Sequence, residues 1–459
     1  MRKLLVGLLL LLGGCVANAP FRTEDGAACE HWKGCGSFYE IHDKYDLGFV
    51  EYSERGNDFN PGQTTTLVNK ITQASNAGNV ALVIFVHGWK HNASTQDSNV
   101  ESFKEALEHL AISKAAGKKK LIGIYIGWRG MSFHGLGVEN LTFWDRKATA
   151  EEVGRGGVTE LLLRLESISA ARKGNFMLTV GHSFGSAIVL SALNDTLMEK
   201  MLDQQRGESA KPFGDAVVLL NPAVEANLGL LLKENSMKVG AMKKPVPSLM
   251  YVVSSRADLP TNLAFPIGQF LGVDLTWNQT VLYRNYYGHT YHIAETSLDH
   301  TTIGNYDAFR TGFMSDEIAD SSSSQRYVAI ANRAQVPVLT SPETKIAPSD
   351  RIGIWGFESY CSDDLAKATK DRFPCFENDP VQFISAPESF IKDHNDVFND
   401  SVKSLLTAAV VKSLSEKNNN VPLRDCAEAG KFSLGICFAH YYDLNKRISA
   451  GEEAKRQGN

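Results

Sequence analysis

Residues 177–190 read MLTVGHSFGSAIVL, an apolar run that is interrupted by Gly181-His182-Ser183-Phe184-Gly185. Strand-forming residues precede this G-x-S-x-G motif, and helix formers follow it at 186–194. The pattern predicts a strand that turns into a helix at a single residue, which strains the backbone of Ser183 and exposes its hydroxyl. The two glycines let the strand and the helix approach closely. Ser183 is therefore a candidate nucleophile, and the first N–H groups of the helix would face negative charge beside it.

Further apolar runs lie on both sides of this motif. They predict strands at 48–52, 79–86, 120–126, 215–220, 248–254 and 381–386, and the run at 79–86 is of the kind that parallel sheets bury on both faces. Helical spacing of apolar residues alternates with them, at 65–75, 99–115, 148–170, 186–203 and 396–412. The alternation predicts an α/β protein with a doubly wound, mainly parallel sheet.

A serine hydroxyl needs a base to take its proton, and the base needs a carboxylate to hold its tautomer. In this architecture the acid and the histidine follow later strands, in the chain order Ser, Asp or Glu, His. Asp258 comes just after the strand predicted at 248–254, and His394 lies in the loop between the last strand and the last helix. The sequence therefore predicts Ser183, His394 and Asp258 as catalytic residues.

Other residues could fill these roles. Glu225 is the reserve acid and His300 the reserve base. His182 is expected to pack beside the nucleophile, and His289 with His292 forms an H-x-x-H pair without a third ligand, so no metal site is expected.

An oxyanion is expected to bind two main-chain N–H groups, those of Phe184 and of Trp89 in the loop after the strand at 79–86. His87 is expected to hold that loop in place.

The N-terminus begins with two basic residues, an apolar run at 4–12 and then Gly13-Gly14-Cys15. The apolar run is shorter than the roughly 20 residues of a spanning helix, so this segment indicates a targeting signal. Leu12-Gly13-Gly14-Cys15 resembles the lipobox of bacterial lipoproteins, which implies that Cys15 carries acyl chains. Val16 follows the cysteine, and in that family a residue other than Asp at this position implies the outer membrane; whether the protein faces the periplasm or the cell surface stays open. The alternative is a plain secretory signal cleaved near residues 17–19.

Six cysteines remain after Cys15. They fall into three close couples, which local closure favours as disulfides: Cys29 with Cys35, Cys361 with Cys375, and Cys426 with Cys437. Disulfides fit an exported protein. A zinc site is the competing interpretation, and no couple has C-x-x-C spacing.

FVHGW at 85–89, the GHSFG motif, Asp258 and His394 together resemble the α/β-hydrolase superfamily, over residues 49–412. The resemblance implies a serine hydrolase that cleaves an ester through an acyl-enzyme, without a cofactor. The anchor suggests a small-molecule or lipid ester as substrate. Thioesterase or peptidase chemistry on the same fold, and a non-catalytic scaffold that binds a partner, are the alternatives.

Acidic residues (52) outnumber basic ones (47), so nucleic-acid binding is not expected. The oligomeric state stays open.

These observations give an expected division of the chain. It comprises a lipoprotein signal peptide (1–14), a tether (15–37), the first part of the hydrolase core (38–259), an insertion or cap (260–380), the last strand and helix of the core (381–412) and a disulfide-stapled C-terminal extension (413–459). The insertion is expected to pack over the edge of the sheet.

Overall fold

The structure is a computed structural model of the 459-residue chain. It describes residues 19–23, 36–112, 116–130, 143–208, 211–243, 246–258, 280–315, 356–359, 361, 372–376 and 379–407. The strands are β1 (Arg22–Thr23), β2 (Gly36–Ser37), β3 (Tyr39–Ile41), β4 (Asp46–Tyr52), β5 (Val80–Val86), β6 (Lys120–Trp128), β7 (Phe176–His182), β8 (Ala216–Leu220), β9 (Met250–Ser255), β10 (Val281–Tyr286), β11 (His289–Ala294), β12 (Gly312–Ser315), β13 (Gly356–Ser359) and β14 (Val381–Ala386). The helices are α2 (Pro61–Ala77), α3 (Ser98–Ile112), α4 (Phe143–Val153), the π-helical turn η3 (Gly154–Val158), α5 (Thr159–Ala170), α6 (Phe184–Gln205), α7 (Ala226–Gly240), α9 (Glu295–Asp299) and the 3-10 turn η6 (Asp307–Phe309). Residues 400–407 are also helical.

A single large sheet organises the described residues, with the strand order β13-β12-β14-β9-β8-β7-β5-β6-β4-β3. All neighbours pair in parallel except the two outermost pairs, β12 with β13 and β3 with β4. The prediction of an α/β protein with a mainly parallel sheet is confirmed. From β5, the sheet continues through β6 and β4 on one side and through β7, β8 and β9 on the other. The direction in which successive strands are added to the sheet therefore reverses at β5.

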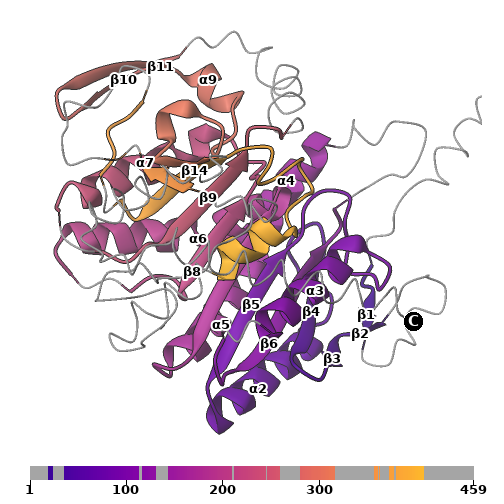
Figure 1. The fold of residues 1–459 in the computed structure, drawn as a ribbon. Coiled ribbons are helices and arrows are strands. Elements are labelled where there is room, and N and C mark those ends of the chain that lie inside the picture. Colours follow the sequence, from indigo (N-terminus) through magenta and orange to yellow (C-terminus); the bar gives the residue numbers. More distant parts are fainter. Residues whose placement is uncertain are drawn as a thin grey trace, which may run out of the picture.

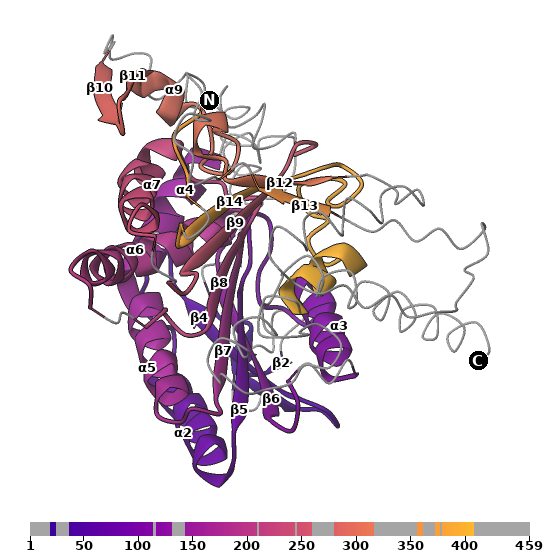
Figure 2. The same ribbon diagram turned by 60° about the vertical axis from the view of Figure 1, so that its left-hand side comes forward.

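Helices cover both faces of this sheet (Figure 1). Figure 2 shows α2, α5, α6 and α7 on one side and α3, with the helix at 400–407, on the other. Two separate apolar clusters match these layers: Leu67 of α2 and Leu161 of α5 belong to one, and Phe103 of α3 and Val402 to the other. Strand β5 is buried along its whole length between them, which is why its seven residues, VALVIFV, show no polar alternation.

The long helix predicted at 148–170 is interrupted. It consists of α4 and α5 joined by η3, and the backbone of Gly156 leaves the helical region there (φ −88°, ψ −134°). The sequence of η3 is GRGGV, and the N–H of Gly157 donates to the carbonyl oxygen of Gly56 at 2.8 Å. A Cβ on Gly156 would lie 2.7 Å from that same oxygen, so the approach of the 53–57 turn requires glycine and breaks the helix.

The segment expected as an insertion, 260–380, contributes to the sheet itself. β12 pairs in parallel with β14, and β13 extends the edge beyond it. The hairpin of β10 and β11 forms a separate two-stranded sheet that lies near α7 (Figure 1). The segment therefore lengthens one edge of the sheet as well as packing beside it. The other expected boundaries stay predictions.

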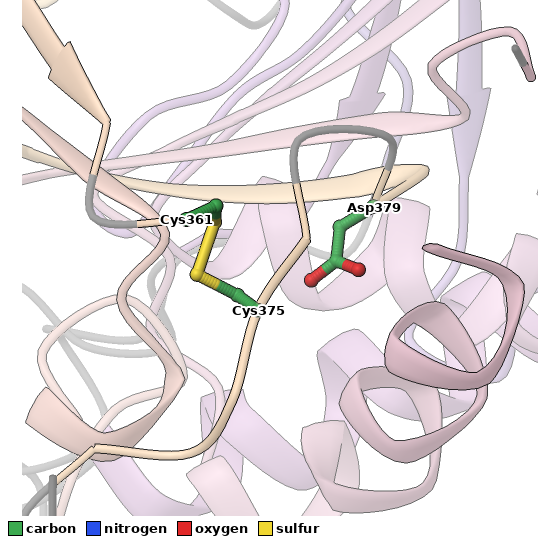
Figure 3. A group of neighbouring side chains, drawn as sticks. All are labelled: Cys361, Cys375 and Asp379. Carbon is green, nitrogen blue, oxygen red and sulfur yellow. A yellow bond between two sulfur atoms is a disulfide. The ribbon is translucent and has the colours of Figure 1, made fainter. Parts of the chain in front are cut away.

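One of the three expected disulfides lies in the described residues. Cys361 and Cys375 are bonded, and Figure 3 shows Asp379 beside them. The two sulfur atoms and a carboxylate oxygen of Asp379 lie within 4.8 Å of one another, a spacing that could hold a metal ion. The sulfur atoms are bonded to each other, however, and offer no thiolate to a metal ion. Cys15, Cys29, Cys35, Cys426 and Cys437 lie outside the described residues. Within the described ranges, no helix has the length and hydropathy needed to span a membrane.

Candidate active site

Ser183 lies at the junction between β7 and α6. Strand β7 ends at His182 and helix α6 begins at Phe184, so one residue makes the turn, with φ 55° and ψ −121°. A non-glycine residue adopts such angles only where its surroundings enforce them. A Cβ on Gly185 would lie 2.0 Å from the carbonyl oxygen of Val86, so the first turn of α6 packs directly against the end of β5. The motif thus holds Ser183 in a fixed and strained position.

A chain of hydrogen bonds connects Ser183 to His394 and Asp258. The hydroxyl of Ser183 lies 2.7 Å from Nε2 of His394, and Nδ1 of the same ring lies 2.9 Å from both carboxylate oxygens of Asp258. Asp258 is fully buried, and Ser183 is 3% exposed. A ring that donates its Nδ1–H to a carboxylate presents the lone pair of Nε2 to the hydroxyl, which is the arrangement that removes a proton from serine.

The carboxyl ends of neighbouring strands bring these three side chains together. Ser183 follows β7, Asp258 follows β9, and His394 lies in the loop that follows β14. β9 and β14 are adjacent and parallel, and the N–H of Arg256 continues their pairing by donating to the carbonyl oxygen of Ala386. Because the carboxyl ends of parallel strands lie on the same side of the sheet, Ser183 and His394 meet there although they are more than 200 positions apart in the chain.

The loop after β5 passes directly against Ser183. A Cβ on Gly88 would lie 2.7 Å from the Cβ of Ser183, so the main chain at Gly88 lies against this residue. Buried His87 fixes this loop, because its Nδ1–H donates to the carbonyl oxygen of Gly88 (2.9 Å) and its Nε2 accepts the N–H of Trp128 (3.1 Å). Burial lowers the pKa of His87 to about 4, which keeps the ring neutral.

The two residues predicted to supply oxyanion donors follow Ser183 and Gly88 directly in the chain. Phe184 is the first residue of α6 and is completely buried, and Trp89 follows Gly88. Main-chain N–H groups at the start of a helix point outward along its axis, and α6 begins directly after Ser183. Their role stays a prediction.

The alternative residues lie elsewhere. Glu225 precedes α7 and forms an ion pair with Lys147 of α4. His300 follows α9, and His289 and His292 belong to the β10–β11 hairpin, where the ring of His292 packs edge-on against Tyr283. None of these belongs to the hydrogen-bonded chain described above.

A cavity of about 320 Å³ begins one turn along α6 from Ser183. Its lining combines the apolar side chains of Ala187, Leu190, Ala223, Val224 and Leu228 with the charged ones of Lys147, Glu151, Arg155, Asp195 and Glu225, of which Lys147 and Glu225 form an ion pair. The N–H of Ala223 donates to the carbonyl oxygen of Ser183 at 3.2 Å, so the cavity wall is connected directly to the candidate nucleophile.

His182, expected beside the nucleophile, and Asn221, for which no role was expected, both bind the main chain of His394. Nε2–H of His182 and Nδ2–H of Asn221 both donate to the main-chain carbonyl oxygen of His394, at 2.8 and 3.1 Å. His182 is part of the motif and Asn221 follows β8 directly, so their place at strand ends was the available signal. The carbonyl that they bind could not be identified from the sequence.

Fold and site together define an α/β protein with a large, mostly parallel sheet and a Ser–His–Asp arrangement at its carboxyl edge. No model of a known protein family matches the chain, and no curated protein does. One solved structure that it resembles is the phospholipase PlaB from Legionella pneumophila in complex with thio-NAD, at 15% identity and a TM-score of 0.24. The match covers 47% of this chain and 48% of that one, so it spans about half of each.

Proposed function

We propose that this protein is a serine hydrolase of the α/β-hydrolase fold that cleaves carboxylic esters through an acyl-enzyme. The observation that carries the proposal is the unbroken hydrogen-bonded chain from the strained Ser183 through His394 to the buried Asp258. A structural role would require neither the strained serine nor the bidentate contact of one ring nitrogen with a buried carboxylate.

In the proposed reaction, Ser183 Oγ attacks the ester carbonyl carbon while His394 Nε2 takes the hydroxyl proton. Asp258 keeps Nδ1 protonated and stabilises the imidazolium that forms. The N–H groups of Phe184 and Trp89 bind the oxyanion, each contributing on the order of 3 kcal/mol. Collapse of the tetrahedral intermediate breaks the ester C–O bond, and the departing alkoxide takes the proton from His394. Water, deprotonated by His394, then attacks the acyl-enzyme carbonyl carbon. Collapse of this second intermediate breaks the bond to Ser183 Oγ, which takes the proton back from His394 as the acid leaves.

We assign the substrate to the cavity beside α6. Its apolar side chains suit a hydrocarbon portion, and its charged ones, with the ion pair of Lys147 and Glu225, suit a polar or hydroxyl-bearing portion. The substrate we propose is therefore a small-molecule or lipid ester with both characters.

The test is covalent labelling of the purified protein with a fluorescent fluorophosphonate, together with turnover of a short-chain p-nitrophenyl ester. Wild type is expected to label and turn over, and Ser183→Ala and His394→Ala are expected to do neither. Matched thioester and anilide substrates distinguish ester cleavage from thioesterase and peptidase activity. A folded wild type that neither labels nor turns over any of the three would contradict the proposal and favour a non-catalytic binding scaffold.

We also propose that Cys15 is lipidated and holds the protein on the bacterial outer membrane. The support is the lipobox-like sequence at 12–15. Several acyl chains would anchor the protein stably, because each buried methylene contributes about 0.8 kcal/mol. Metabolic labelling with an alkyne fatty acid tests this: the wild type should incorporate it and Cys15→Ser should not. Label retained in Cys15→Ser would contradict lipidation at this residue.

A further inference from the structure

His182 is buried beside the nucleophile but has no part in the proton transfer described above. It is 1% exposed, and the centroid of its ring lies 5.0 Å from that of the His394 ring. Its Nε2–H donates to the main-chain carbonyl oxygen of His394 at 2.8 Å. The residue that precedes the candidate nucleophile thus binds the backbone of the candidate base.

Asn221 binds the same carbonyl oxygen from the next strand. Its Nδ2–H donates to that oxygen at 3.1 Å, while its Oδ1 accepts the N–H of Ser255 at 2.9 Å. The backbone of Asn221 has φ 43°, a conformation in which asparagine is enriched. Asn221 therefore connects the ends of β8 and β9 to the loop that carries His394.

Ser255 extends this support along the loop. Its hydroxyl donates to the carbonyl oxygen of Ile391 at 2.6 Å and accepts the N–H of Ala257 at 3.1 Å. The contacts from His182, Asn221 and Ser255 come from the ends of three neighbouring strands, β7, β8 and β9. Residues 387–399 form no helix or strand of their own, so these contacts to the sheet hold the loop in place.

The protonation state of His182 suits a fixed donor. Because Nε2 donates to a carbonyl, Nδ1 is the unprotonated nitrogen, and it is buried without a hydrogen-bond partner among the described residues. Burial, and next the nearby ring of His394, lower the pKa of His182 well below its usual range. A ring that stays neutral and donates one proton to a main-chain oxygen serves as a hydrogen-bond donor to that oxygen and does not compete with His394 for the serine proton.

We propose that His182 and Asn221 are positioning residues, which fix the backbone of His394 so that its Nε2 stays in line with the hydroxyl of Ser183. The proposal rests on the proposed function, and it assigns to the x position of the motif a task in the reaction. Because His394 lies in a loop, its carbonyl oxygen is the point at which the sheet can hold it. Loss of the donor would let the ring move while leaving the strands intact, and displacement of a reacting group by about 1 Å can cost on the order of 100-fold in rate.

The experiment compares His182→Leu with His182→Gln in the full-length protein. Leucine fills the space without a donor, whereas glutamine places an amide N–H near the position of Nε2. In His182→Leu, kcat per fluorophosphonate-titrated site should fall at least about tenfold with KM within about twofold, and His182→Gln should recover most of the loss. The second-order rate of fluorophosphonate labelling should fall in parallel, because it depends on the same proton transfer.

Asn221→Asp provides a second variant. It keeps the Oδ1 acceptor for Ser255 but replaces the donor with an oxygen that repels the carbonyl of His394, so it should also lower kcat. A merely structural role would lower the melting temperature and leave kcat per titrated site unchanged, and that result in either residue would overturn its assignment. Equal losses in His182→Leu and His182→Gln would likewise overturn the role of the donor. Failure of the proposed function is a different result, in which wild type behaves like Ser183→Ala in labelling and turnover, and it would overturn this inference as well.

Discussion

A Cβ placed on Gly88 would lie 2.7 Å from the Cβ of Ser183 and 3.0 Å from the carbonyl oxygen of His182. The loop after β5 therefore lies in direct contact with the junction of β7 and α6, with no space for a side chain at Gly88. We predict that Gly88→Ala lowers kcat/KM of the ester assay by about 100-fold, because the added methyl group displaces the loop or the nucleophile.

Gly78→Ala is the matched control for this substitution. A Cβ on Gly78, at the end of α2, meets no atom within 4 Å, so kcat/KM should stay within about twofold of wild type. Full activity in Gly88→Ala would show that the loop can withdraw without cost.

Asp258 is the residue whose amide variant tests the tautomer of His394. In Asp258→Asn, the side-chain NH2 can donate to Nδ1, which moves the ring proton to Nε2 and removes the acceptor for the serine hydroxyl. We predict that kcat falls by about 10³- to 10⁴-fold, with KM and the melting temperature little changed.

Asp393→Asn serves as the control for Asp258→Asn, since Asp393 is an exposed carboxylate on the residue that precedes His394. It should retain nearly full kcat. Steady-state kinetics at saturating ester compare the two variants, and an Asp258→Asn enzyme with more than a tenth of wild-type kcat would exclude this role for the carboxylate.

The buried ring of His87 predicts a loss of stability in acid. Its pKa is about 4 in the folded protein and about 6.5 when unfolded, so between these values the unfolded chain binds a proton that the folded chain does not. The contribution is fully present above pH of about 6.5 and is lost as the pH falls toward about 4, up to about 3 kcal/mol. Urea unfolding between pH 8 and 4.5 measures it.

His87→Gln has no group at this position that titrates in that range. Its free energy of unfolding should therefore fall less steeply with decreasing pH than that of wild type, by up to one proton in slope. His182, whose pKa is also lowered, is unchanged in both proteins and contributes equally to them. Parallel slopes for the two proteins would contradict the prediction.

The sequence was sufficient for the central strands of the sheet and for the residues placed at their carboxyl ends, because both depend on local patterns. Apolar runs such as 80–86 reveal buried strands, and a residue just after such a run, like Asp258, must lie at the carboxyl edge of a parallel sheet. His394 could be placed for the same reason, from its position between β14 and the helix at 400–407.

Contacts between distant main-chain groups could not be predicted in this way. The carbonyl of His394 as the acceptor for His182 is one case, and the approach of Gly56 that interrupts the helix at Gly156 is another. β12 and β13 were missed because four-residue strands such as GFMS are too short to show a period. The GRGG run at 154–157 was a signal for the interruption, since glycine disfavours the interior of a helix.

The ion pair of Lys233 and Asp379 joins α7 to the segment before β14 in a fully buried position. The Nζ and carboxylate oxygen atoms lie 3.3 Å apart, and both side chains are 0% exposed. Burial lowers the pKa of Lys233 and raises that of Asp379, so each charge depends on the other for compensation. We predict that Lys233→Met lowers the free energy of unfolding by about 3–5 kcal/mol, because it leaves the carboxylate buried without a cation. The double variant Lys233→Met/Asp379→Asn should recover at least about half of that loss, since no buried charge remains.

Arg164→Met is the control for Lys233→Met, because Arg164 and Glu160 form an ion pair whose side chains are 46% and 67% exposed. Loss of this exposed pair should cost no more than about 0.5 kcal/mol. Urea unfolding at pH 7 measures the free energy of unfolding of all three variants. A double variant less stable than Lys233→Met would mean that Asp379 stabilises the fold independently of Lys233.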